Sequence, residues 1–162
     1  MVDVATLPPG LDEGEALAHS DNTGFRTTLD IAGHPLVADE PVAVGGTDAG
    51  PSPYGLLSGA LAACTTMTLH LYAKAKRLAV TGIRVHVKHE KVHELDCEHC
   101  ELDPNAKVDR LSRTIWIDGA IDDKGRERMM QIADKCPVHR TLQGQIRIVT
   151  TSGQAAETPS AG

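Results

Sequence analysis

The sequence is poor in aromatic residues, in positive charge and in long apolar runs. The 162 residues include 16 basic and 22 acidic side chains, for a net charge of −6, and no apolar run approaches the ~18 residues of a membrane span. The acidic N-terminus also lacks the basic start and apolar centre of a secretory signal. We therefore expect a cytoplasmic protein with no membrane contact and no nucleic-acid partner, because cations for phosphates and rings for stacking bases are both scarce. The only aromatic residues are Phe25, Tyr54, Tyr72 and Trp116.

Length and apolar content indicate one domain. With 162 residues, 41% of them apolar, the chain can bury a core without metals or disulfides. Residues 1–22 are acidic and interrupted by proline and glycine, which predicts a poorly ordered segment. Residues 23–151 form the predicted domain, and residues 152–162 form a predicted flexible tail.

Hydrophobic periodicity predicts an α+β fold with a mostly antiparallel sheet, a long buried central helix and a second, shorter helix. Ser52 is a suitable N-cap for the long helix, and Asp123 is a suitable N-cap for the second. The apolar stripe of the long helix includes Cys64, Met67 and Leu71. The elements expected in chain order are a β-hairpin over 25–38, a helix over 53–78, strands over 82–93 and 107–122, a helix over 124–136 and a strand over 145–151.

The cysteines are the residues best suited to chemistry. In a reducing cytosol they are not expected to form structural disulfides, so metal binding, thiol chemistry and plain burial all stay open. A cysteine on an apolar helical stripe, such as Cys64, is by itself typical of a small buried hydrophobe. A thiolate at Cys64 would need a cation from elsewhere, because the helix dipole acts only within the first turn. The four cysteines are Cys64, Cys97, Cys100 and Cys136.

Cys97 and Cys100 form a CxxC motif flanked by acidic residues. Those acids disfavour a thiolate, which argues against a thioredoxin-like nucleophile, whereas a zinc ion would favour deprotonated thiols. Cys136 and His139 offer a remote second pair of ligands. A surface CxxC without metal is the favoured interpretation, and a zinc-binding structural protein is an alternative that would take Cys136 away from other chemistry.

Two stretches of the sequence resemble the OsmC/Ohr family of thiol peroxidases and organic hydroperoxide resistance proteins. The resemblance covers about residues 25–150. It implies an OsmC-like fold and an intertwined homodimer with sites built from both subunits. The two stretches are Asp39-Glu40-Pro41 with Gly45-Gly46-Thr47-Asp48-Ala49-Gly50-Pro51-Ser52-Pro53-Tyr54 leading to Leu61-Ala62-Ala63-Cys64, and Ala133-Asp134-Lys135-Cys136-Pro137-Val138-His139-Arg140-Thr141-Leu142.

The resemblance also implies a redox pair of Cys64 and Cys136. The Cys64 thiolate would attack the O–O bond of a small hydroperoxide, and Cys136 would condense with the resulting sulfenic acid to give a disulfide. An external dithiol reductant would restore both thiols, with no other cofactor. The family's thiolate partner is an arginine from the N-terminal β region. Arg26 is the only base before Lys74 and is the expected partner, with Arg140 as the fallback.

Tyr54 departs from the family pattern. Many members carry a glutamate at this position, after the proline, where it orients the arginine. That carboxylate is missing here unless Asp48 or Glu40 replaces it. The departure leaves a second hypothesis open, a non-catalytic ligand-binding module in the same fold. His86, His89 and His93 are predicted to lie on a solvated strand face, with no catalytic role.

Overall fold

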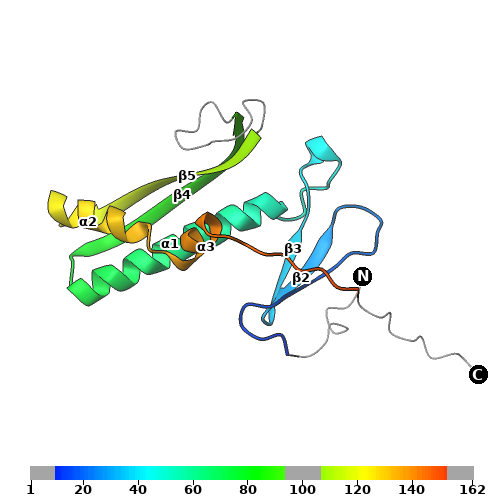
Figure 1. The fold of residues 1–162 in the computed structure, drawn as a ribbon, viewed down its shortest axis with the longest axis horizontal. Helices are drawn as coiled ribbons and strands as arrows, with labels where there is room; N and C mark the ends of the chain where they lie inside the picture. Colours follow the sequence, from blue (N-terminus) through cyan, green and yellow to red (C-terminus); the bar gives the residue numbers. More distant parts are fainter. Residues whose placement is uncertain (1–9, 94–106, 153–162) are drawn as a thin grey trace, which may run out of the picture.

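The computed structural model describes residues 10–93 and 107–152. Strands β1–β3 form one antiparallel sheet, and β4 and β5 form a long antiparallel hairpin beside three helices (Figure 1). This confirms the α+β class and the antiparallel sheets. The elements are β1 (Ala16–His19), β2 (Thr27–Ile31), β3 (His34–Ala38), the 3-10 turn η2 (Val42–Val44), α1 (Pro53–Lys76), β4 (Val80–His93), β5 (Lys107–Gly119), α2 (Asp123–Ala133) and α3 (Pro137–Gln143).

The β2–β3 hairpin forms where the sequence predicted it. Ala32 and Gly33 form a two-residue turn with φ of 49° and 85°, the left-handed conformation that matches the twist of paired strands. Asp30 Oδ1 accepts a hydrogen bond of 2.7 Å from the Gly33 N–H and holds the turn closed.

Helix α1 begins at the predicted cap. The Ser52 hydroxyl accepts a hydrogen bond of 3.2 Å from the Gly55 N–H, and Pro53 occupies the first turn, where its missing N–H costs nothing. The helix ends when Arg77 adopts a left-handed conformation. By length and composition alone α1 is apolar enough to cross a membrane, a test that core helices of soluble proteins also pass.

One side of α1 packs on the β4–β5 hairpin and α2. Its buried residues recur every four positions: Leu61, Thr65, Leu69 and Ala73. The stripe predicted through Met67 and Leu71 is wrong, because these side chains are 64% and 66% exposed. The core beneath α1 consists of Leu69, Ala73, Ile117, Met129, Ile132 and Ala133.

The predicted second helix divides into two. Helix α2 is capped by Asp122, not Asp123, and ends at Ala133. Helix α3 then starts at Pro137, because a proline cannot donate the backbone hydrogen bond that a continuing helix needs. Cys136 is therefore the N-cap residue of α3 and not part of the last turn of a longer helix.

Two terminal segments also differ from expectation. Strand β1 lies inside the segment 1–22, which was expected to be poorly ordered. The strand predicted over 145–151 is absent, and this stretch is exposed without regular structure. Its alternating pattern is that of a strand, but it pairs with none of the strands β1–β5 of the described residues.

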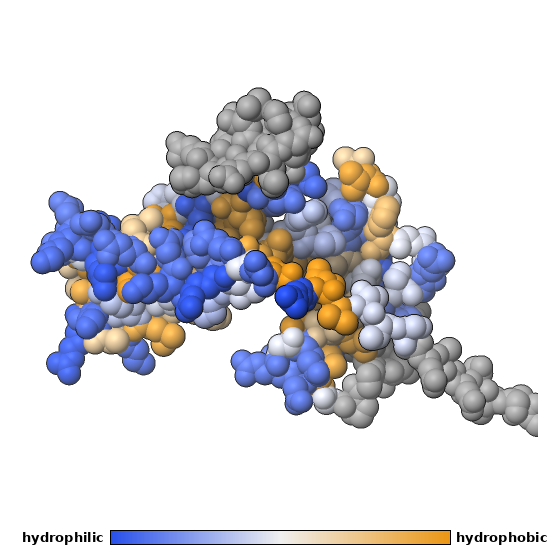
Figure 2. Space-filling model, in the orientation of Figure 1, coloured by the Kyte–Doolittle hydropathy of each residue, from blue (hydrophilic) through white to orange (hydrophobic). Residues whose placement is uncertain are grey.

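The described chain has two unequal parts. The helix–hairpin part (α1, β4, β5, α2 and α3) contains the core, while the β1–β3 sheet lies beyond the N-terminal end of α1 (Figure 1). In the N-terminal sheet and the loop after it, only Ala38 and Asp39 are buried. Figure 2 shows apolar residues gathered in the middle of the molecule, in the hollow between these two parts.

Candidate functional site: a cysteine pair between α1 and α3

Cys64 and Cys136, which the family resemblance paired, lie on α1 and at the start of α3, two helices that pack together. Cys64 lies on α1 and is half-buried, while Cys136 precedes α3 and is fully buried. Both are free thiols, and each shifts the pKa of the other.

The pKa values of the two thiols are shifted in opposite directions: that of Cys64 is raised and that of Cys136 is lowered. Burial raises the pKa of Cys64, and its hydrogen bond to Cys136 raises the pKa further. The Val138 N–H and the Thr68 hydroxyl act in the opposite direction without overcoming these effects. In this arrangement Cys64 keeps its proton, so a thiolate at Cys64 needs a positive charge that its present neighbours do not provide.

Burial would also raise the pKa of Cys136, but its hydrogen-bonding neighbours outweigh burial and lower it. The largest of these contributions comes from the Cys64 thiol. The His139 N–H, the Thr65 hydroxyl and the Val138 N–H add to it.

A buried arginine approaches the pair through Thr65. Arg113 on β5 donates a hydrogen bond of 2.9 Å from its Nη1 to the Thr65 hydroxyl and one of 3.0 Å to the carbonyl of Ala133. Its other terminal nitrogen pairs with Asp134 at 2.7 Å. The sequence analysis missed both Arg113 and Thr65. A signal was present, because Arg113 occupies an inward position in the strand alternation of Leu111, Ile115 and Ile117.

The predicted arginines lie elsewhere in this subunit. Arg26 precedes β2 and is exposed, and it makes no side-chain hydrogen bond or ion pair within residues 10–93 and 107–152. Arg140 is exposed on α3, where its N–H makes the ordinary helical bond to the Cys136 carbonyl. Neither guanidinium is bonded to Cys64 in the described part of the chain.

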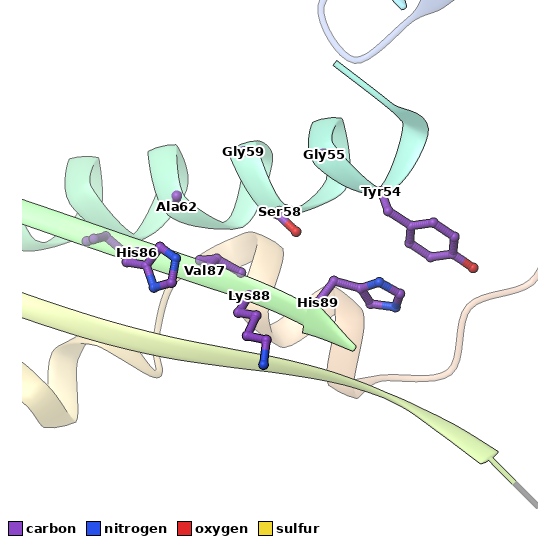
Figure 3. A pocket seen from close by; sticks show the side chains of 10 residues that line it. Tyr54, Gly55, Ser58, Gly59, Ala62, His86, Val87, Lys88 and His89 are labelled. Carbon is purple, nitrogen blue, oxygen red and sulfur yellow. The ribbon is translucent and has the colours of Figure 1, made fainter. Parts of the chain in front are cut away.

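Tyr54 lines a second feature, a cleft between α1 and β4, where it lies beside His89 (Figure 3). Its ring stacks on His89 at a centroid distance of 4.1 Å and an interplanar angle of 7°. His89 Nε2 lies 2.7 Å from Asp109 Oδ1. The solvated face expected for His89 is therefore wrong, since its side chain is only 14% exposed. The cleft measures about 570 Å³ and is lined by Tyr54, Gly55, Ser58, Gly59, Ala62, Val85, His86, Val87, Lys88 and His89.

The loop before α1 is organised by a carboxylate that the sequence analysis did not single out. Asp39 is 2% exposed and accepts hydrogen bonds from the Glu40, Thr47 and Ala49 N–H groups and from the Thr47 hydroxyl. The Thr47 hydroxyl is the largest influence and lowers the pKa of Asp39 to about 2. Gly46 lies so close to this turn that a Cβ would sit 1.8 Å from the Glu40 carbonyl oxygen. Backbone packing therefore accounts for a glycine in this loop.

The zinc alternative cannot be located in the structure. Cys97 and Cys100 lie outside the described residues. Among the residues that are described, no group of three or more His, Cys, Asp or Glu side chains could hold a metal ion.

The described chain is thus an α+β protein with two free cysteines, one on a long helix and one at the start of a short helix packed against it. The model of the family described as OsmC-like protein matches residues 46–151, so the chain belongs to the OsmC-like family. This confirms the resemblance inferred from the cysteine motifs. A search of curated proteins found no match.

Solved structures share the fold at low sequence identity. An OsmC-like protein from Mycoplasma pneumoniae is similar with a TM-score of 0.62 and 19% identity, over 80% of this chain and 86% of that one. The organic hydroperoxide resistance protein OsmC from Legionella pneumophila gives 0.57 and 17%, over 80% and 88%. An organic hydroperoxide resistance protein from Elizabethkingia anophelis gives 0.58 and 16%, over 80% and 86%.

Proposed function

We propose that the protein is a thiol-dependent peroxidase that reduces organic hydroperoxides or hydrogen peroxide through Cys64 and Cys136. Two free cysteines on the packed elements α1 and α3 carry the proposal, because a two-cysteine peroxidase needs a second sulfur near the first. Membership of the OsmC-like family and the likeness to proteins named for hydroperoxide resistance support it.

Accessibility assigns the order of the two thiols. Cys136 is fully buried and cannot meet a peroxide first, whereas Cys64 is half-buried. The Cys64 thiolate attacks the hydroxyl oxygen of the O–O bond and becomes a sulfenic acid. The other oxygen leaves and takes up a proton from solvent, which gives an alcohol or water. Cys136 then displaces hydroxide to form the disulfide. An external dithiol reductant returns both sulfurs to thiols, and no other cofactor takes part.

A second copy of the chain completes the site in this proposal. The raised pKa of Cys64 calls for a cation, and Arg26 is an exposed arginine in the weakly packed N-terminal part. The side of α1 that carries Met67 and Leu71 is exposed, and exposed apolar patches mark interaction surfaces. A homodimer that covers this side and brings Arg26 of one subunit to Cys64 of the other satisfies both requirements.

Anaerobic titration with cumene hydroperoxide tests the function. We expect one equivalent of peroxide to form a Cys64–Cys136 disulfide, mapped by mass spectrometry. Cys64→Ser should abolish peroxide consumption, and Cys136→Ser should still consume one equivalent and stop at a sulfenic acid. If both thiols of the wild type stay reduced in excess peroxide, the peroxidase proposal is wrong.

The arginine partner has its own test. Arg26→Lys and Arg26→Gln form a matched pair that keeps or removes the charge. We expect Arg26→Gln to slow the reaction of Cys64 with peroxide strongly, because the thiolate loses its cation, and Arg26→Lys to slow it less. Equal rates in the wild type and Arg26→Gln would remove Arg26 from the site.

A ligand-binding module is the second candidate function, and Tyr54 favours it. Tyr54 occupies the family's glutamate position and stacks on His89 beside a cleft that contains neither cysteine. A bound ligand in that cleft should be unaffected by Cys64→Ser and lost in Tyr54→Ala. Peroxide turnover should show the opposite pattern, so the same two variants separate the two functions.

A further inference from the structure

Arg113 is a nearly buried charge that the proposed mechanism does not use. It lies on β5 opposite Val87 of β4, and its side chain is only 11% exposed. A guanidinium in such a position needs acceptors from the protein for its N–H groups, because little water reaches them. Arg113 finds these acceptors on two other elements, helix α1 and the C-terminal end of helix α2.

On α1 the arginine holds the residue that follows Cys64. Its Nη1 donates a hydrogen bond of 2.9 Å to the hydroxyl of Thr65, which is fully buried. The same hydroxyl donates its single proton to the Leu61 carbonyl one turn earlier, at 2.8 Å. These two bonds fix the turn of α1 that carries Cys64 relative to β5.

At the other end the arginine holds the backbone that precedes Cys136. Nη1 also donates to the Ala133 carbonyl at 3.0 Å, and Nη2 donates to Asp134 Oδ1 at 2.7 Å. The same Ala133 carbonyl accepts the backbone N–H of Cys136 at 3.3 Å. Arg113 and Cys136 thus share one acceptor oxygen, so the position of the Cys136 backbone depends on an atom that Arg113 holds.

We propose that Arg113 is a positioning residue that clamps the Cys64 turn of α1 to the Cys136 segment between α2 and α3, and so raises the effective concentration of one thiol at the other. A disulfide forms only within a narrow range of Cα separations and angles, and holding two reacting groups in place raises their effective concentration. A guanidinium suits this task, because its planar fork of donors reaches several acceptors at fixed angles. The use of the clamp in catalysis rests on the proposed peroxidase function, whereas the clamp itself does not.

A merely structural arginine would behave differently. Its removal would lower the stability of the fold and leave the two thiols of the native protein equally close. Arg126 provides the matched control, because its Nη1 donates to the Ile117 carbonyl at 2.7 Å and ties α2 to β5 at a residue far in sequence from both cysteines. The clamp therefore predicts different redox behaviour for the two arginine variants.

The first experiment measures a redox equilibrium and needs no peroxide. In a Cys97→Ser/Cys100→Ser background, the protein is equilibrated without oxygen in mixtures of reduced and oxidised glutathione. Each oxidised glutathione accepts two electrons and two protons from Cys64 and Cys136, which form a disulfide while two glutathione thiols are released. Alkylation and mass spectrometry give the disulfide fraction, and hence the effective concentration of the two thiols.

Three arginine variants are compared in this assay. Arg113→Met removes every hydrogen bond of the clamp and should lower the effective concentration about tenfold. Arg113→Lys keeps a donor and should restore part of it, whereas Arg126→Met should leave it at the wild-type value. Circular dichroism shows whether each variant retains the fold. An equal fall in Arg113→Met and Arg126→Met would mean general loosening of the core and would overturn the inference.

Thr65→Val and Thr65→Ser test the α1 end of the clamp. Valine keeps the shape of threonine without the hydroxyl that accepts from Arg113, and serine keeps that hydroxyl. We expect Thr65→Val to lower the effective concentration and Thr65→Ser to leave it nearly unchanged. This pair decides the matter if Arg113→Met does not fold, because neither change alters the charge of the core.

A kinetic experiment joins the clamp to function. In the closing step the Cys136 thiolate attacks the sulfur of the Cys64 sulfenic acid, the S–S bond forms, and the S–O bond breaks to release hydroxide, which takes up a proton. After one equivalent of cumene hydroperoxide, Arg113→Met should slow this closure more than it slows sulfenic acid formation, so that dimedone captures more sulfenic acid than in the wild type.

The outcomes separate the clamp from the peroxidase. An effective concentration that is the same in the wild type, Arg113→Met and Thr65→Val would overturn the inference and leave the peroxidase proposal standing. A lower effective concentration in Arg113→Met, in a protein whose thiols ignore peroxide, would uphold the clamp and refute the peroxidase.

Discussion

The helix–hairpin part and the N-terminal sheet of this chain are equally regular in secondary structure but very different in burial. In the first, α1 and α2 enclose Leu69, Met129 and Ala133 with less than 2% of each side chain exposed. In the second, the strands are well paired, yet β2 has no buried residue and Phe25 and Ile31 are 55% and 40% exposed.

This difference teaches that strand pairing and core formation are separate requirements. A three-stranded sheet needs a hydrophobic face packed on another layer for lasting stability. Among residues 10–93 and 107–152, the N-terminal sheet has its hydrogen bonds but not a second layer. The helix–hairpin part has both, and it holds the free cysteines Cys64 and Cys136.

The largest effect is expected inside the helix–hairpin core. Leu69→Ala should lower the free energy of unfolding by about 2–5 kcal/mol, because it leaves a cavity among fully buried neighbours. Leu71→Ala, two residues along the same helix, is the matched control at a side chain that is 66% exposed. Urea unfolding of both variants measures the difference.

The control also tests the comparison between the two parts. If Leu71 stays exposed in solution, Leu71→Ala changes stability by about 0.5 kcal/mol or less. If a second copy covers this side of α1, the loss is larger at high protein concentration and shrinks as dilution dissociates the dimer. Equal losses for Leu69→Ala and Leu71→Ala at high dilution would contradict the packing of α1 described above.

The helix–hairpin part was also the more predictable of the two. Local signals in the sequence mark its element boundaries within a few residues. They are the N-cap at Ser52, the alternation of polar and apolar residues along β4, and the proline at 137. The stripe through Met67 and Leu71 failed because α1 is apolar on several sides, so periodicity alone could not select the side that faces the core. Arg113 was missed because a charge at an inward strand position was counted as surface.

The terminal segments could be predicted less well for a different reason. The pattern over 145–151 is that of a strand, and Ile148 and Val149 are 88% and 84% exposed in the single chain. A strand is defined by its partner, and the sequence of one chain does not contain the position of a second copy. The pairing of Cys64 with Cys136 came from family resemblance, since no spacing rule pairs two residues that are 72 positions apart.

An intermediate effect is expected at the link between the two parts, where Asp39 holds the loop before α1. The pKa of this carboxyl, about 2, lies below its ordinary 3.8, so its ionised form favours the folded loop. That contribution is complete above about pH 3.8 and is lost as the pH falls through about 2. Asp39→Asn lacks it at every pH.

Hydrogen exchange of the Thr47 and Ala49 amides measures this effect locally, because both donate to Asp39. Near neutral pH, we expect both amides to be much less protected in Asp39→Asn than in the wild type. The difference should shrink toward pH 2. The Gly33 amide, which bonds to Asp30 instead, serves as the internal control. Protection that is the same in both proteins at neutral pH would show that the loop is held by something other than this carboxylate.

The smallest effect is expected on the outer face of the β4–β5 hairpin. Arg84 lies 5.8 Å from the centroid of the Trp116 ring and 3.4 Å from Asp118, but its side chain is 69% exposed. Exposed ion pairs and cation–π contacts each contribute at most about 1 kcal/mol, and salt screens the ionic part. Arg84→Ala should therefore lower the unfolding free energy by about 1 kcal/mol or less at every protein concentration, with Arg128→Ala on α2 as a surface control. A loss of several kcal/mol that shrinks on dilution would mean that another subunit covers this face, and that the helix–hairpin part is as incomplete on its own as the N-terminal sheet.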